Sequence, residues 1–434
     1  MELSNITIGI IGIIIFLFLM LLKMPIGFTF LAAGLIGMTL IRGFGPAASN
    51  IGAAPFSQTA SYVLSSAALF ILMGQFVSNA AIAEDVYDTG YKWFGNIPGG
   101  LALATMLACT GFAACTGSSL ASALTMTALG GREMKRYGYD DGLATGVIAA
   151  GGTLGILIPP SLIFIIYGYF TEVSIGKLFA AGILPGLMLS GFLMTGIYVM
   201  CRVNPKLGPC GPRFSWKERL VSLRGVVGIL ILFFLIMGGL YLGICTPTEA
   251  GAVGAFGAFV FALVRRRLTL RLFLVSLKDS VVNTCMALTV LIGAMVFGNF
   301  LAQSGIPAAL SAWVGKLPLP PIGILIVILL MYLPLGCFID SLPMVLLTLP
   351  IIYPIIMRIG IDPIWFGVLL VLMCEISLIT PPVGLNAYVV SGASGVPINK
   401  VFRGGAPFLI LFFVGVVILV AFPQISLFIP NLMK

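Results

Sequence analysis

Residues 151–161 cannot form one continuous α-helix, although they lie in the middle of a long apolar run. Two glycines open this stretch, and Pro159 and Pro160 come near its end. A proline pair removes two backbone donors and clashes with the preceding turn, while glycine adds conformational freedom. The surrounding run, 143–169, is long enough to cross a membrane. Because interrupted backbone at membrane depth persists only where protein or a polar cavity satisfies it, we expect a broken membrane helix here.

The same design occurs again 222 residues later. Residues 375–384, with the sequence EISLITPPVG, also place a proline pair inside an apolar run. One such pair is often only a kink in a membrane helix. Interrupted segments at corresponding positions in two halves of a chain are the sequence feature that best indicates a transporter's binding site.

Composition restricts the chain to a membrane. It is 60% hydrophobic and 9% charged, with a mean hydropathy of +1.15. Such a chain cannot cover itself with a polar surface, so we predict an all-α polytopic membrane protein. The net charge of +9 does not indicate nucleic acid as a partner, because the basic residues punctuate apolar spans and form no single patch.

Side chains that could carry out a reaction are scarce. The sequence has no histidine, and its eight cysteines show no metal-binding spacing, so imidazole catalysis and the usual zinc sites are disfavoured. It also lacks the GxxxxGK[ST] loop of ATP-driven pumps. We therefore predict that the protein is not an enzyme.

Apolar runs predict ten membrane crossings and two re-entrant hairpins. The hairpins, 97–130 and 318–357, carry small, polar or proline residues in the middle of an apolar segment, so we expect each to enter and leave on the same side. The crossings are predicted at about 6–22, 25–41, 61–82, 142–170, 178–200, 226–244, 247–264, 281–303, 364–391 and 405–428.

The basic residues predict the orientation. If the N-terminus is outside, most of the 23 Lys and Arg residues fall in inner loops, above all in 202–224 and 265–278. This bias agrees with the positive-inside rule. Ten crossings keep both termini on the outer side, and we expect the basic loops to meet anionic lipid.

The chain also reads as two repeats. Adding 222 places Ser119 on Ser341, Asp140 on Asp362 and the first proline pair on the second. In the predicted topology one copy starts inside and the other outside, so the repeats are inverted. The predicted division is N-terminal scaffold helices at 1–60, a first repeat at 61–200 with hairpin 97–130 and broken helix 142–170, a connector with scaffold helices at 201–278, and a second repeat at 279–434 with hairpin 318–357 and broken helix 364–391.

Four motifs carry a family resemblance. They are GTLGILIPPS at 152–161, PTEAGAVGA at 247–255, DSLPM at 340–344 and ITPPVGLN at 379–386. Together they resemble the large membrane subunit of the tripartite ATP-independent periplasmic (TRAP) transporters over nearly the whole chain. The resemblance implies a sodium-coupled secondary transporter of elevator type in the bacterial inner membrane, with periplasmic termini. It also implies a separate small four-helix membrane subunit, a periplasmic substrate-binding protein, and a carboxylate-bearing substrate such as a C4-dicarboxylate or sialic acid.

The resemblance implies at least two Na⁺ sites, which map onto the hairpin tips and the breaks. A hard cation prefers oxygen ligands, and hydroxyls with unwound carbonyls supply them without burying a full negative charge. In the first half we expect Thr116, Ser118 and Ser119 to face Gly155, Ile158 and Pro159. In the second half we expect Gly336, Asp340 and Ser341 to face Ser377, Thr380 and Val383. Ser377 stands where the resemblance leads us to expect glycine, so it either adds a hydroxyl ligand or blocks a close backbone approach.

Three acidic residues have separate interpretations. Asp340 and Glu375 lie at membrane depth, which makes them candidates for function. Glu249 falls at an outer turn between two helices and is expected to cap or pin that turn. The hydroxyls have an alternative use as well, since Ser and Thr in apolar helices commonly bond their own backbone.

We expect residues 97–170 and 318–391 to move as one body against the remaining helices. The alternatives are local gating around a fixed site, an ion-coupled anion transporter of a related inverted-repeat family that needs no binding protein, and a channel. A channel would need a continuous polar pore, whereas the hydroxyls and breaks gather at two points.

Overall fold

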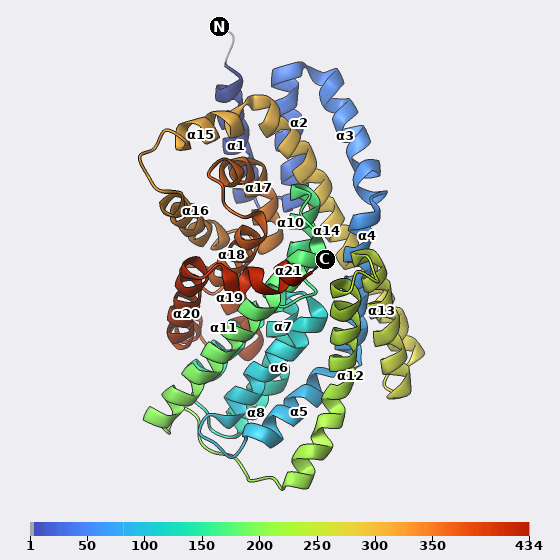
Figure 1. Cartoon of the computed structure of the whole chain (residues 1–434), viewed down its shortest axis with the longest axis vertical. Coiled ribbons are helices and arrows are strands. Elements are labelled where there is room, and N and C mark those ends of the chain that lie inside the picture. The colour runs from blue at the N-terminus through green and yellow to red at the C-terminus, as the bar shows by residue number, and fades with distance from the viewer. Residues whose placement is uncertain (1–3, 81, 434) are drawn as a thin grey trace.

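A computed structural model describes residues 4–80 and 82–433, and of residues 113–115 it describes the backbone alone. Within these ranges the chain forms helices and no strand, as predicted. Eight helical segments of the described part are long and apolar enough to cross a membrane, and shorter apolar helices accompany them. Figure 1 shows one helical body with the first hairpin in its lower part and the second in its upper part.

The helices follow one another along the chain with short connections. In order they are α1 (Asn5–Leu21), α2 (Ile26–Arg42), α3 (Phe44–Thr59), α4 (Tyr62–Asn79), α5 (Ile82–Phe94), α6 (Gly100–Thr116), α7 (Ser119–Met126), the π-helical turn η1 (Thr127–Gly131), α8 (Arg132–Arg136), α9 (Asp141–Leu157), α10 (Leu162–Thr171), α11 (Ile175–Val203), α12 (Trp216–Tyr241), α13 (Pro247–Val264), α14 (Leu270–Ser304), α15 (Ile306–Val314), α16 (Pro321–Gly336), α17 (Ser341–Arg358), α18 (Pro363–Ser377), α19 (Leu385–Ser394), α20 (Ile398–Ala421) and α21 (Gln424–Leu432).

Both broken helices are interrupted at the predicted positions. The first is α9 followed by α10, and the second is α18 followed by α19. Adding 222 to the bounds of α9, 141–157, gives 363–379, and α18 occupies Pro363–Ser377. Both proline pairs are joined by cis peptide bonds. The starts of α9 and α18 therefore repeat at the spacing of 222 residues, and their ends depart from it by two residues.

The turns that start the two broken helices are also alike. The Asp140 side chain accepts a hydrogen bond from the Leu143 N–H at 2.9 Å, and Asp362 accepts one from the Trp365 N–H at 2.9 Å. An aspartate N-cap satisfies one of the free donors of the first turn. The glycines two residues before these caps both have φ +73°, a conformation that disfavours a side chain. Short turns of defined geometry thus connect each hairpin to its broken helix.

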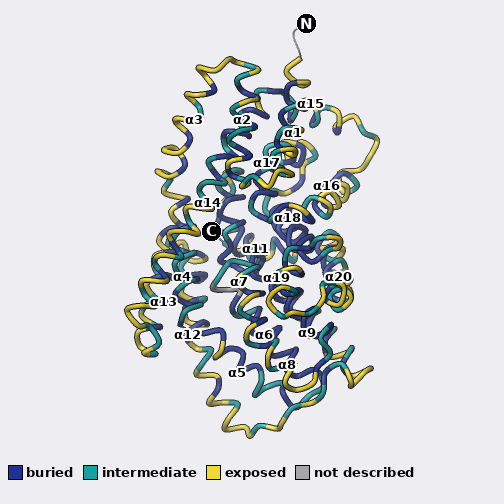
Figure 2. Tube along the Cα trace, turned by 180° about the vertical axis from the view of Figure 1, so that it is seen from behind, coloured by how far each residue is buried: buried dark blue, intermediate teal, exposed yellow. Residues whose placement is uncertain are grey.

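The first segments of the broken helices lie at the centre of the fold. In α9 every residue from Gly142 to Leu157 is buried, and in α18 every residue from Trp365 to Ser377 is buried. A helix that is buried all round belongs to the interior. Figure 2 shows this buried core between hairpins, with exposed residues concentrated on outer helices such as α3 and α13.

Two long helix pairs flank this core. Helix α2 packs on α14, where a methyl group on Gly27 would lie 2.9 Å from Thr289. Helix α4 packs on α13, where Gly254 meets Met73. Small residues at such crossings let membrane helices approach closely.

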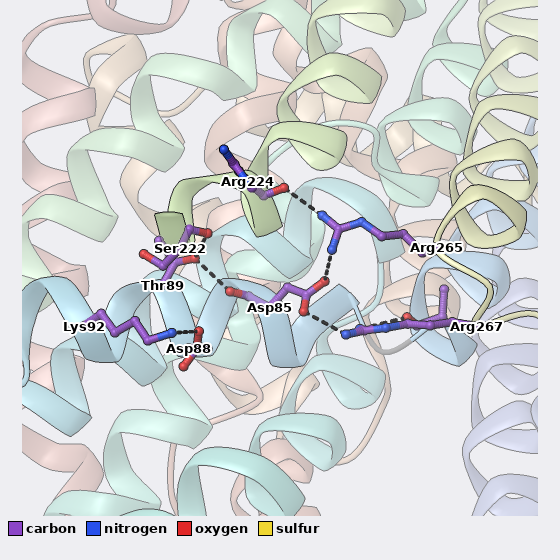
Figure 3. A network of polar contacts seen from close by, with 9 residues as sticks. Asp85, Asp88, Thr89, Lys92, Ser222, Arg224, Arg265 and Arg267 are labelled. Atoms are coloured by element: carbon purple, nitrogen blue, oxygen red, sulfur yellow. Dashed lines mark hydrogen bonds and ion pairs between the residues drawn. The ribbon is translucent and has the colours of Figure 1, made fainter. Parts of the chain in front are cut away.

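Helix α5 is fastened to the connector by charged and polar contacts (Figure 3). Asp85 pairs with Arg265 at 3.6 Å and with Arg267 at 3.0 Å. One turn further on, the Thr89 hydroxyl donates to the Ser222 carbonyl at 2.8 Å. These contacts connect α5, the helix before the first hairpin, to the beginning of α12 and to the residues that directly follow α13.

Some helix predictions were incomplete or wrong. Helices α3, α5 and α15 were not predicted as elements, because they are short or carry polar residues. The predicted crossing at 405–428 is wrong over its last seven residues, because α20 ends at Ala421 and Pro423 interrupts the run before α21.

Candidate functional site

The tip of the first hairpin lies against the first break. Helix α6 ends at Thr116 and α7 begins at Ser119. A methyl group on Gly117, where φ is +58°, would lie 3.0 Å from the Pro160 carbonyl oxygen. A methyl group on Gly155 would lie 2.9 Å from the Ser118 carbonyl oxygen. The two backbones can approach this closely because these two residues are glycines.

The predicted residues of the first half do come together at this contact. The Thr116 hydroxyl donates to the Phe112 carbonyl at 3.1 Å, and Ser118 caps α7 by accepting from the Ala121 N–H at 3.4 Å. Ile158 and Pro159 are buried at the break itself. The Thr116 hydroxyl proton is used within its own helix, and its oxygen accepts from the Ser122 hydroxyl at 3.2 Å, which leaves one lone pair available to a cation.

The tip of the second hairpin lies against the second break in the same way. Helix α16 ends at Gly336, and Asp340 caps α17 by accepting from the Ser341 N–H at 2.8 Å. The Cys337 thiol points at the Thr380 and Pro381 carbonyl oxygens, at 3.7 and 3.6 Å. The hairpin tip and the unwound carbonyls therefore face each other.

The predicted residues on the α18 side of this contact differ in their hydrogen bonds and in how they pack against the hairpin. The Ser377 hydroxyl donates to the Cys374 carbonyl at 2.5 Å, and the Thr380 hydroxyl donates to the Ile376 carbonyl at 2.7 Å. Ser377 also faces Gly336, where an added methyl group would lie 1.7 Å from its oxygen. The Ser377 side chain thus fills the space beside Gly336 that a glycine at position 377 would leave empty. Val383 is half-buried at the end of the break.

Glu375 connects the two hairpin tips. Its side chain is 1% exposed and lies in the last turn of α18. The Ser119 hydroxyl donates to one carboxylate oxygen, and the Ser341 hydroxyl donates to the other at 3.2 Å. The sequence marked Glu375 as a functional candidate but did not place it among the ion ligands.

A cavity of about 730 Å³ opens beside both hairpin tips. Three elements of the flanking pairs, α2, α4 and α14, close its other side. Among the described residues that line it there is no Lys or Arg, and Asp340 is the one charged side chain. Its polar lining consists of Gln75, Ser78, Thr116, Ser118, Ser119, Asn283, Thr289, Asp340 and Ser341.

Four of these lining residues were not predicted. Gln75 and Ser78 lie on α4, and Asn283 and Thr289 lie on α14. The only sequence signal was an isolated amide or hydroxyl inside an apolar span, which is also common in helices without any ligand. Which of them face a site depends on how α4 and α14 pack against the hairpins.

The residues at the two contacts fit a hard monovalent cation. At the first contact the Pro160 carbonyl lies against the hairpin tip that carries the Thr116 and Ser118 hydroxyls, and at the second the Thr380 and Pro381 carbonyls lie against the tip at Cys337. Oxygen is the ligand that such a cation prefers. No group of three or more His, Cys, Asp or Glu residues occurs in the described part of the chain, so the donor set does not suit a transition metal.

Comparison with known proteins decides the family. The family described as "Tripartite ATP-independent periplasmic transporter, DctM component" matches residues 13–425. The chain belongs to this family. The curated relatives agree with this DctM assignment.

Among curated relatives, the Pseudomonas aeruginosa C4-dicarboxylate TRAP transporter large permease protein is 39% identical, over 92% of this chain and 93% of its own length. The Vibrio cholerae sialic acid TRAP transporter large permease protein is 33% identical, over 94% and 95%. Among solved structures, the YdaH transporter of Alcanivorax borkumensis has a TM-score of 0.61 at 15% identity and covers 88% of each chain, which shows a shared fold.

These findings confirm the predicted family and the all-α membrane fold. They also confirm that this DctM-family chain is a transporter permease and not an enzyme. The chain is therefore a multi-pass membrane component of a tripartite transporter.

Proposed function

We propose that this DctM-family chain is the permease of a sodium-coupled secondary transporter that imports a small carboxylate-bearing solute. The observation that carries the proposal is the cavity of about 730 Å³ between both hairpin tips and the flanking helices. Its volume suits a small metabolite. Hydroxyls and amides line it, but no described Lys or Arg does, so an anionic solute needs a counter-charge from solution. Na⁺ bound at the adjacent hairpin contacts supplies that charge.

The sodium proposal places one site at each contact between hairpin tip and break. Thr116, Ser118, Ser119 and the carbonyls near Gly155 serve the first site, and Asp340, Ser341 and the Thr380 region serve the second. Support comes from the close backbone approach at Gly117 and Gly155 and from the carbonyls that face Cys337. Two sites at corresponding positions agree with the repeat of helix boundaries.

Two proteins and a lipid are proposed as partners. A small four-helix membrane subunit holds the scaffold, and a soluble periplasmic binding protein delivers the solute, in keeping with a tripartite system. The exposed basic residues Arg202, Lys206, Arg213 and Lys217 lie in the stretch from the last turn of α11 to the first turn of α12, where they can meet anionic lipid.

We place the protein in the bacterial inner membrane with both termini periplasmic. In this orientation the start of α2 and the end of α4, which line the cavity, lie on the cytoplasmic side. The cavity then represents the inward-facing state. The two halves are inverted repeats in the same scheme.

An elevator movement carries the solute and sodium sites across the membrane. Polar contacts tie the two hairpin-and-helix units to each other: besides the Glu375 bridge, the Tyr167 hydroxyl donates to the Pro363 carbonyl at 2.6 Å, and the Tyr353 hydroxyl donates to the Thr171 carbonyl at 3.2 Å. Helix α20 travels with them, because Gly404 contacts Gly142 and Gly146 through the backbone. The pairs α2–α14 and α4–α13 form the scaffold.

Uptake into proteoliposomes tests the function. The chain is reconstituted with its small subunit, and a panel of C4-dicarboxylates, sialic acid and related acids is offered with the binding protein. Saturable uptake of one acid class that requires Na⁺ and is lost when choline replaces it is the expected result. Uptake that needs no binding protein supports the related anion transporter instead, and unsaturable flux supports a channel.

A further inference from the structure

The carboxylate of Glu375 is unusual because this one side chain accepts hydrogen bonds from both halves of the fold. Its two oxygens accept from Ser119, the first residue of α7, and from Ser341, the first residue of α17. These serines are 222 residues apart and occupy equivalent hairpin tips. Both are buried, at 2% and 1% exposure. The residue equivalent to Glu375 in the first half is Thr153, whose hydroxyl donates to the Ala150 carbonyl at 2.7 Å.

The charge of Glu375 has no fixed partner. In the described part of the chain no Lys or Arg forms an ion pair with it. Another ionisable group nearby, Asp340, is acidic as well. An unpaired carboxylate buried in a membrane protein is costly unless it binds a proton or has a compensating cation. The proposed sodium sites are the places from which such a cation can act.

The hydrogen bonds of the two serines give Glu375 a second effect. A serine hydroxyl that donates its proton to a carboxylate is held in one orientation, and its oxygen lone pairs point elsewhere. An outer carboxylate that orients a ligand in this way also makes the ligand more basic. Glu375 therefore prepares Ser119 and Ser341 together as oxygen ligands.

We propose that Glu375 is a positioning residue and a shared counter-charge for both sodium sites. This inference rests on the proposed sodium coupling and adds that the two sites share one anion. Loss of its charge weakens both sites together. Loss of either serine weakens only the site in that half.

Sodium-induced thermal stabilisation tests this without any substrate, because a ligand that binds the folded protein raises its unfolding temperature. The full complex in detergent is titrated with NaCl, with choline chloride keeping ionic strength constant. For Glu375→Gln we expect the Na⁺ midpoint to rise by about 10–100-fold while the steepness of the curve stays as in the wild type. For Ser119→Ala and Ser341→Ala we expect a shallower curve, since one site fails and the other persists.

Two further variants complete the test. Glu375→Asp keeps the charge, so it should shift the midpoint less than Glu375→Gln, and it provides the measurement if the glutamine variant does not fold. Glu249→Gln changes an exposed glutamate far along the chain and should leave the midpoint unchanged. Sodium activation of uptake should follow the same order of variants.

The outcomes separate the two proposals. If the wild-type protein shows no Na⁺-dependent stabilisation or uptake, sodium coupling itself is wrong. If the wild type responds but folded Glu375→Gln keeps the wild-type midpoint, or if Glu375→Asp shifts the midpoint as far as Glu375→Gln does, sodium coupling stands and the role of Glu375 is wrong. Where Glu375→Gln does not fold, a Glu375→Asp curve that is shallower than the wild-type curve overturns the role of Glu375. A shallower curve for Glu375→Gln, like that of one serine variant, restricts the glutamate to one site and also overturns the inference.

Discussion

Gly336 and Ser377 face each other so closely that a methyl group on Gly336 would lie 1.7 Å from the Ser377 oxygen. Gly336→Ala should therefore separate the second hairpin from α18 and abolish Na⁺-dependent uptake. Gly323→Ala on the same helix is the matched control, because its methyl group would meet only Pro320 at 3.5 Å. Adding Ser377→Gly to Gly336→Ala removes the opposing side chain and should restore part of the uptake. Wild-type uptake by Gly336→Ala alone would contradict this packing.

Thr380→Ala should raise the Na⁺ concentration needed for half-maximal uptake, by about 10-fold for the loss of one oxygen near the second break. Thr380→Ser keeps the hydroxyl and should stay near the wild type. Thr195→Ala is the control, because Thr195 also donates to its own helix, at 2.7 Å to the Gly191 carbonyl, but lies exposed on α11. An unchanged Na⁺ curve for Thr380→Ala would assign that hydroxyl to backbone capping alone.

Cross-linking should distinguish the moving body from the scaffold. Leu124 on α7 and Met286 on α14 line opposite sides of the cavity. Cysteines at these two positions, in a background without native cysteine, should be joined by a reducible bifunctional thiol reagent, and transport should stop until the link is reduced. A cysteine pair at Thr171 and Tyr353 lies within the body, so linking it should leave transport intact. Continued transport with the first pair linked would rule out the elevator.

The Asp85 contacts should matter for stability and not for sodium. Asp85 is 16% exposed and pairs with two arginines, so Asp85→Asn should lower the free energy of unfolding by about 1–3 kcal/mol. Asp88→Asn on the same helix breaks a more exposed pair with Lys92 and should cost about 0.5 kcal/mol or less. Thermal unfolding of both variants checks this. Equal losses would mean that the Asp85 contacts do not fasten α5.

Glu249 should contribute to stability by capping the first turn of α13. The Thr246 N–H and hydroxyl donate to its carboxylate at 2.7 and 2.9 Å, and the Glu249 N–H donates to the Thr246 hydroxyl oxygen at 3.3 Å. This reciprocal cap satisfies donors that the start of a helix otherwise leaves free. Glu249→Ala should therefore unfold at a lower temperature than the wild type, and Glu249→Gln, which keeps an acceptor, should unfold between the two. Equal unfolding temperatures for Glu249→Ala and the wild type would exclude this cap as a source of stability.

The sequence was most informative where backbone chemistry dictates structure. The proline pairs interrupt their helices and Glu249 caps its turn, both as predicted, and the equivalent residues Asp140 and Asp362 prove to be helix caps in both halves. These features follow from local rules: a proline cannot continue a helix, and a carboxylate or hydroxyl satisfies free donors in a first turn. The family followed as well, because its motifs are spaced over most of the chain.

Features that depend on packing between distant segments could not be predicted from the sequence. Nothing near Gln75 or Asn283 in sequence says that these amides face the same cavity. Likewise, the position of Glu375 between two hairpins needs both halves of the fold in place. The sequence left two alternatives for Ser377, an added hydroxyl ligand or a blocked backbone approach. Its contact with Gly336 shows that the side chain fills the space between the second hairpin and α18.

The cavity without a described lysine or arginine has a consequence for how cargo leaves. A guanidinium built into the wall would hold an acid with equal strength on both sides of the membrane. Under the proposed sodium coupling, the counter-ion would arrive with the cargo and depart with it. In a cell that keeps its internal sodium low, the ion would dissociate after the site opens inward, and the acid would then face Asp340 with nothing to offset the repulsion. Discharge would thereby be set by the sodium concentration of the receiving compartment, without a separate trigger in the protein wall.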